Sequence, residues 1–167
     1  MTGTIMRRIL GVARFDRESY LWILWNDRAG GDAVLIVAIT QLLITLGVVG
    51  LDLRAFLDLF ISGMFFWLIY SGIAWAVANF LLDGHGAFTG VFRIAGFAFP
   101  TLLLIIFADY LIDAPWSLLA GSAWFVAVVA FGMKEAVEVP VDRGWLAAAG
   151  GLVGWVILDR IFQGLGT

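Results

Sequence analysis

Long apolar stretches dominate this sequence of 167 residues, and they constrain its fold more than any other feature. A helix of about 20 apolar residues crosses the hydrocarbon core of a bilayer. Backbone groups inside a bilayer need internal partners, which leaves helices and closed barrels as spanning structures. The stretches lack the alternation of barrel strands. They predict an all-α fold, a polytopic integral membrane bundle with about five transmembrane helices. The predicted spans are residues 33–51, 59–82, 94–112, 114–133 and 144–163, and the ends of the fifth are the least well defined.

The composition agrees with a membrane protein and excludes several other classes. Hydrophobic residues make up 62% and charged residues 14%, whereas soluble domains contain about 25% charged residues. The mean hydropathy is +1.00. A formal net charge of −3 without a basic stripe excludes nucleic acid as a partner. Cysteine is absent, which excludes disulfides, zinc–thiolate sites and a thiol nucleophile.

Residues 1–32 precede the first predicted span, and residues 33–167 form the predicted bundle. The first part is expected to be a cytoplasmic, amphipathic segment, because apolar and polar side chains fall on different helical faces. One face has Ile5, Ile9, Val12 and Ala13, and the other has Arg7, Gly11, Arg14 and Glu18. The apolar run after the first arginines is too short for a signal peptide. An interfacial helix is therefore predicted, and a disordered N-terminus is the alternative.

The distribution of basic residues predicts the orientation in the membrane. Short cytoplasmic loops are enriched in Lys and Arg. Eight of the ten basic residues fall in the N-terminal segment and in the second and fourth loops, which share one side of a five-span protein. This pattern places the N-terminus in the cytoplasm and the C-terminus outside. With this topology, the whole net charge of −3 belongs to the outer face.

Polar residues inside the predicted spans are few, and no acid or base lies at the centre of a span. The candidates for intramembrane polar contacts are Gln41, Tyr70 and Asn79. Such side chains usually form hydrogen bonds between helices, and the alternative is a polar path through a small channel or transporter between the first two spans. Pro100 removes one backbone hydrogen bond and is expected to kink the third helix.

Small residues four positions apart predict close helix packing inside the bundle rather than an oligomer interface. The pairs are Gly72 with Ala76, Ala74 with Ala78, and Gly150 with Gly154.

Known catalytic and metal-binding motifs are missing from the sequence. Asp83 and His85 offer only two metal ligands, whereas metal sites usually have three or four. There is no phosphate-binding loop, no His-Glu-x-x-His and no Gly-x-Ser-x-Gly. The sequence therefore predicts a protein that is not an enzyme and has no cofactor or metal.

Three blocks of sequence resemble the Yip1 domain family in its prokaryotic branch. The blocks are residues 15–20 with 26–33, residues 84–100, and Trp124 with residues 134–136 and 143–144. The second block is the most specific, with its glycine-rich turn, arginine, Gly-aromatic-Ala step and proline. The resemblance implies a five-span helical protein of a prokaryotic cell membrane with a cytoplasmic N-terminus. The eukaryotic family members are associated with vesicle traffic and Rab-type small GTPases through a longer N-terminal region, and the family supplies no catalytic residues.

The expected function follows from these features. We predict a non-catalytic integral membrane protein that acts through lipid and protein contacts, either in membrane organisation or as an accessory subunit of a membrane assembly. Its expected partners are membrane lipids, and other membrane proteins or further copies of the same chain are alternatives. Interfacial arginine and aromatic side chains are the candidate contacts. They are Arg14, Arg17, Trp22, Trp25, Phe88 and Arg93.

Overall fold

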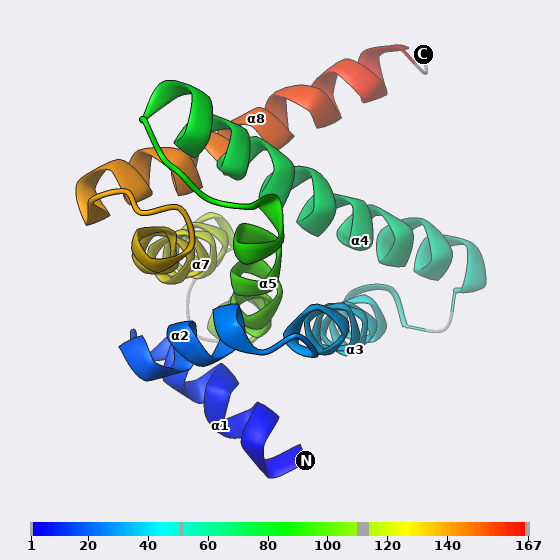
Figure 1. Ribbon diagram of the computed structural model, residues 1–167. Helices are drawn as coiled ribbons and strands as arrows, with labels where there is room; N and C mark the ends of the chain where they lie inside the picture. Colours follow the sequence, from blue (N-terminus) through cyan, green and yellow to red (C-terminus); the bar gives the residue numbers. More distant parts are fainter. Residues whose placement is uncertain (1, 51, 110–113, 166–167) are drawn as a thin grey trace.

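The computed structural model describes residues 2–50, 52–109 and 114–165, and its regular elements there are all helices (Figure 1). The α-helices are α1 (Thr2–Ala13), α2 (Arg17–Trp25), α3 (Ala29–Val49), α4 (Leu53–Ala76), α5 (Phe88–Ala98), α6 (Leu103–Asp109), α7 (Ala114–Ala136) and α8 (Val141–Leu165). A π-helical turn, η1 (Val77–Leu81), extends α4, and a 3-10 turn, η2 (Phe99–Leu102), joins α5 to α6. Five helical segments in the described part of the chain are long and apolar enough to span a bilayer. The predicted all-α, five-span membrane fold is confirmed.

The spanning helices extend beyond the predicted apolar runs at several ends. Helix α3 begins at Ala29, α4 at Leu53, α5 at Phe88 and α8 at Val141. The first turns of these helices contain charged residues that end an apolar run, such as Asp32 in α3 and Asp142 in α8. At the start of α4, for example, the side chain of Asp52 accepts hydrogen bonds from the backbone N–H groups of Arg54 and Ala55 at 3.0 and 3.1 Å. The predicted continuation of the third span through residues 110–112 lies outside the described residues.

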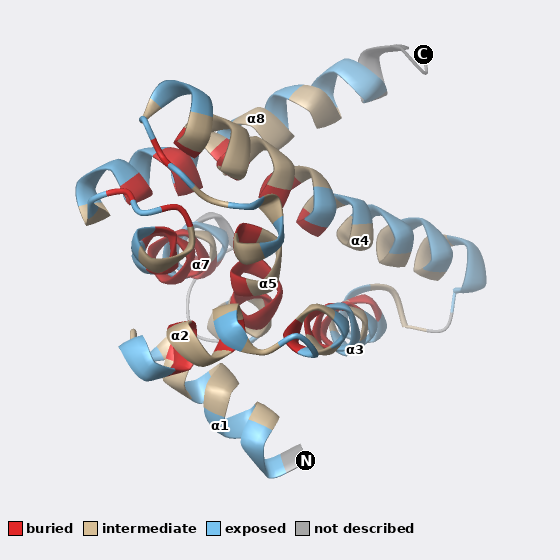
Figure 2. Cartoon of the chain, in the orientation of Figure 1, coloured by how far each residue is buried: buried red, intermediate tan, exposed pale blue. Residues whose placement is uncertain are grey.

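The spanning helices form a bundle in which α4 and α8 are steeply inclined to α3 and α7 (Figure 1). Figure 1 looks nearly along α3 and α7, whereas α4 and α8 run across the view. Helix α8 packs against both α4 and α7, and α5 contacts α3, α4 and α7. Many of the buried residues therefore lie on α5 and in the adjoining parts of α3 and α7 (Figure 2). The outer faces keep large exposed apolar side chains, such as Leu35 and Phe65, which is the pattern expected of helices solvated by lipid.

Small residues make the contact between α4 and α8 possible. A Cβ atom added at Gly154 would lie 2.9 Å from the Cγ2 atom of Ile73, and one added at Gly150 would lie 3.3 Å from the Cγ2 atom of Val77. Ala74 and Ala78 are fully buried. Internal packing is confirmed for these two pairs of small residues.

The third small pair behaves differently. A Cβ atom added at Gly72 would meet no atom within 4 Å, so the prediction of internal packing is wrong at this position. Gly72 is only partly buried, and there is open space where its side chain would lie.

The third spanning segment changes its helical pattern at Pro100, the position where a kink is predicted. The α-helical pattern of α5 stops at Ala98, and Pro100 lies in the 3-10 turn before α6. Proline has no backbone N–H to donate. The hydroxyl of Thr101 donates a hydrogen bond of 2.7 Å to the carbonyl of Ala98 and satisfies one acceptor in this turn.

Candidate functional site

The N-terminal segment folds into a helical hairpin, α1–α2. Asp16 caps α2, and its carboxylate accepts hydrogen bonds from the backbone N–H and the hydroxyl of Ser19 at 3.2 and 2.7 Å. The hydroxyl of Ser19 is the main cause that lowers the pKa of Asp16 below its ordinary value. The two helices approach so closely that a Cβ atom added at Gly11 would overlap the Ser19 side chain. The predicted amphipathic helix is thus the first arm of a hairpin.

Tyr20 fixes this hairpin to the bundle. Its side chain is buried, and its hydroxyl lies 3.1 Å from the carbonyl oxygen of Val12 in α1 and 2.9 Å from that of Val128 in α7. A single hydroxyl proton is shared between these two acceptors. Burial raises the pKa of Tyr20 far above its ordinary value, so the hydroxyl remains a donor at any physiological pH.

Polar contacts tie α2 to the bundle on two further sides. The Nε atom of Arg17 lies 3.0 Å from Glu135 Oε1, and its Nη2 atom lies 3.5 Å from Glu135 Oε2. Arg93 in α5 donates from Nη1 to the carbonyl oxygen of Leu24 at 3.0 Å. This carbonyl is in the last turn of α2, where helical carbonyls lack intrahelical partners. Two of the arginines predicted to contact lipid or partners therefore have partners within the protein.

The two predicted interfacial tryptophans differ in their surroundings. Trp22 is partly buried: its ring lies edge-on to Phe97, and the guanidinium of Arg8 lies 5.5 Å from its ring centroid. Trp25, one turn later, is 83% exposed. Trp25 is thus the tryptophan of α2 that is open to a lipid or a partner.

The loop between η1 and α5 is held tightly by backbone contacts. The N–H of His85 donates to the carbonyl of Val137 at 2.8 Å, and the N–H of Gly86 donates to Asn79 Oδ1 at 3.1 Å. Trp75 Nε1 donates to the carbonyl of Gly86 at 2.9 Å. A Cβ atom added at Gly86 would overlap the carbonyl oxygen of Ala136. The predicted glycine-rich turn is therefore a site of close backbone approach to the loop between α7 and α8.

Aromatic and charged side chains make further contacts around the loop between η1 and α5. Phe88, a predicted interfacial residue, is partly buried and contacts the rings of Trp75 and Phe92. Arg143 at the start of α8 donates to the carbonyl of Leu82 at 3.1 Å and lies 3.5 Å from Asp83. The hairpin α1–α2, the loop before α5 and the loop before α8 thus meet at one end of the bundle. Eight of the ten basic residues lie in these segments or in the helices that adjoin them.

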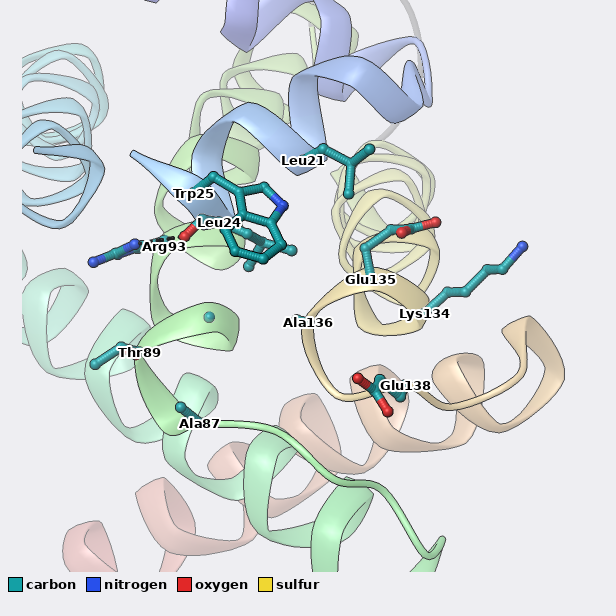
Figure 3. A pocket seen from close by; sticks show the side chains of 11 residues that line it. Leu21, Leu24, Trp25, Ala87, Thr89, Arg93, Lys134, Glu135, Ala136 and Glu138 are labelled. Carbon is teal, nitrogen blue, oxygen red and sulfur yellow. Dashed lines mark hydrogen bonds between the residues drawn. The ribbon is translucent and has the colours of Figure 1, made fainter. Parts of the chain in front are cut away.

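An open pocket of about 400 Å³ lies between α2, the start of α5 and the end of α7 (Figure 3). We call it the α2–α7 pocket. Leu21, Leu24 and Trp25 form its apolar wall, and Figure 3 shows Arg93 pointing away from it. The other lining residues are Ala87, Thr89, Gly90, Lys134, Glu135, Ala136 and Glu138.

Two charged residues of the α2–α7 pocket are available for a ligand. Glu135 is engaged by Arg17, but Lys134 and Glu138 have no ionic partner within the described part of the chain. Glu138 also has a positive φ of 59°, a conformation that is uncommon for a residue with a side chain. Sequence reasoning missed both residues. The apolar spacing of Leu21, Leu24 and Trp25 on α2 is the signal that could have indicated the pocket wall.

The polar residues within the spans are used for packing contacts. Gln41 Nε2 donates to the carbonyl of Leu59 at 3.0 Å and so joins α3 to α4. Its amide fits against Gly63, where a Cβ atom would overlap it. Asn79 donates to Trp75 and accepts from Gly86. These contacts favour the packing interpretation of both amides over a polar path.

Tyr70 is fully buried between α4 and its neighbours. Its ring contacts Phe66 and Phe125, and its hydroxyl has no hydrogen-bond partner among the described residues. The structure thus places all three intramembrane candidates at helix contacts. In the described residues, no three Asp, Glu or His side chains are grouped as a metal site.

Comparison with known proteins identifies the family. The family model of the Yip1 domain matches residues 12–158, which is most of the chain. The chain belongs to the Yip1 domain family. The matched region of this Yip1 domain protein begins within α1 and ends within α8, so it includes α2, the α2–α7 pocket, the first four spanning segments and most of the fifth. No curated protein and no solved structure matches the chain.

Proposed function

We propose that this Yip1 domain protein is a non-catalytic membrane protein of a prokaryotic cell membrane that acts by binding lipids and another membrane protein. The proposed partner-binding site is the α2–α7 pocket. The observation that supports it most is the exposed Trp25 beside a hollow with an apolar wall. Protein interfaces are enriched in such aromatic anchors, which pack into the partner at the centre of the contact.

The charges of the pocket favour a particular kind of partner segment. Lys134 and Glu138 present one cation and one anion at the edge of an apolar wall. A complementary segment has an apolar side chain between an acidic and a basic residue. Charges at the rim of an interface mainly determine specificity and association rate, so the apolar contacts with Leu21, Leu24 and Trp25 are expected to supply most of the affinity.

Site-specific photo-crosslinking in cells that naturally produce the protein tests this proposal. A photoreactive amino acid at Thr89, which lines the pocket, should give a defined protein adduct that Trp25→Ala abolishes. The same photoreactive group at Asp142, exposed at the start of α8, is the matched control and should give no such adduct. Adducts with lipid alone at Thr89, or the same products at both positions, would contradict a protein partner in the pocket.

We also propose that the end of the bundle with the α2–α7 pocket faces the cytoplasm. The positive-inside pattern supports this orientation, since the segments richest in arginine and lysine meet there. The absence of cysteine allows a clean labelling test. On intact cells, an impermeant thiol reagent should label Asp52→Cys and should leave Glu138→Cys unlabelled until the membrane is permeabilised. Both positions are exposed, so the reverse labelling pattern would refute the orientation.

A further inference from the structure

Helix α1 has apolar side chains on two different faces, and only one of these faces packs on the bundle. Val12 is fully buried, and Ile5 and Ile9 pack against the core. Met6 and Leu10 project the other way, with 57% and 51% of their surfaces exposed. An amphipathic helix that only covers a bundle would present a polar outer face. The exposed apolar pair therefore needs another apolar neighbour.

The arginines of the hairpin fall into two groups. Arg8 and Arg17 are engaged inside the protein, Arg8 with Ser19 and Trp22 and Arg17 with Glu135. Arg7 and Arg14 are exposed and have no acidic partner in the part of the chain that is described. Residues three or four positions apart share a helical face, so both lie beside Leu10.

A hollow of about 430 Å³ lies between these arginines, where α1 meets α2. Its lining residues are Arg7, Arg8, Leu10, Gly11, Arg14, Asp16, Glu18 and Ser19. Three arginines thus face two acids, and the carboxylate of Asp16 is already used by Ser19 and the start of α2. Glu18 also lines the hollow, and its negative charge weakens the attraction of the hollow for an anion.

The position of α1 suits contact with the membrane surface. Figure 1 shows α1 at the rim of the bundle, below α2 and outside the spanning helices. Helix α1 has exposed apolar side chains beside exposed arginines, which is the composition expected of an interfacial helix. Interfacial helices bury their apolar side chains in the acyl boundary and keep arginines at the headgroups.

We infer that the hollow between α1 and α2 binds the phosphate of an anionic phospholipid. Arg7 and Arg14 hold the phosphate through charge-assisted hydrogen bonds, and Met6 and Leu10 contact the lipid chains beside it. This inference rests on the proposed lipid-binding role but not on the α2–α7 pocket or its partner. It specifies the lipid class as anionic, because the uncommitted side chains that frame the hollow are mainly arginines.

Lipid binding to the purified full-length protein in mild detergent tests the inference. Phosphatidylglycerol is titrated against phosphatidylcholine, and bound lipid is counted by native mass spectrometry. A basic residue near a lipid surface contributes about 1 kcal/mol, so Arg7→Gln and Arg14→Gln should each weaken phosphatidylglycerol binding by about fivefold. Glu18→Gln should strengthen it, because the residue that repels the phosphate becomes neutral.

Arg28→Gln is the matched control, because Arg28 is an exposed arginine of the same region that does not line the hollow. It should bind phosphatidylglycerol like the parent chain, and inorganic phosphate at millimolar concentration should not compete. Equal loss in Arg28→Gln and Arg14→Gln, unchanged binding in the Arg7 and Arg14 variants, or full competition by free phosphate would overturn the inference. Crosslinking at Thr89 is unaffected by these variants, so failure here is distinguishable from failure of the proposed partner site.

Discussion

The Gly86→Ala variant should be markedly less stable than the parent protein. The added Cβ atom would overlap the carbonyl oxygen of Ala136 and would lie 2.7 Å from the Cα atom of Val137. Both atoms belong to the backbone and cannot move away as the end of a side chain can. Overpacking of this kind costs about 2–3 kcal/mol, which lowers the midpoint of thermal unfolding by roughly 4–10 °C. Thermal unfolding in mild detergent, followed by tryptophan fluorescence, measures the shift.

Gly72→Ala is the matched control for this prediction. A Cβ atom at Gly72 meets nothing within 4 Å, and alanine is the better helix former by up to about 1 kcal/mol. The control variant should therefore unfold at the same temperature as the parent or slightly higher. Equal destabilisation of the two variants would show that the backbone approach at Gly86 is not the cause.

The spans could be predicted from the sequence because a segment surrounded by lipid has to meet simple requirements of composition and length. A stretch such as residues 33–51 has to be apolar and helical wherever it lies in the bundle. The helix ends were less predictable, because charged residues such as Arg54 and Asp58 can occupy helical turns near or beyond the membrane surface. A search for apolar runs ends a helix at such residues, whereas the backbone continues through them.

A spacing of four between small residues does not by itself predict which glycines pack against another helix. Gly72 and Gly150 each have a small partner four residues later, but only Gly150 packs against another helix. The difference depends on which face of α4 turns toward α8. The orientation of α4 depends on the packing of all the helices in the bundle, and it cannot be predicted from a spacing of four residues.

For a similar reason, the sequence predicts only some of the contact residues that the structure leaves exposed. Arginine and tryptophan favour the interface, but they also form strong contacts within proteins. Arg93 and Trp22 have such contacts, through Leu24 and Phe97, whereas Arg14 and Trp25 remain exposed. The α2–α7 pocket needs α2 and the end of α7 side by side, more than one hundred residues apart in the sequence.

The second large effect is expected at Tyr20, whose side chain joins the N-terminal hairpin to α7. Replacement of a large buried aromatic residue with alanine costs about 3–5 kcal/mol. The hairpin has its own cap at Asp16 and its own contacts between α1 and α2, so the loss should be local rather than global. Tyr20→Ala should therefore detach the hairpin while the spanning helices remain folded.

Hydrogen–deuterium exchange in detergent can distinguish this local opening from general unfolding. In Tyr20→Ala, amides of α1 and α2 that exchange through detachment of the hairpin should do so faster by roughly two to three orders of magnitude, and those of α4 and α8 should keep their protection. Tyr20→Phe is the matched control: it keeps the ring, removes the hydroxyl shared between Val12 and Val128, and should cost only about 1 kcal/mol. Uniformly faster exchange in every helix of Tyr20→Ala would show that the hairpin is part of the cooperative core. In that case α1 and α2 would unfold only together with the spanning helices. Detachment of the hairpin from α7 could then play no part in the binding of a partner or a lipid.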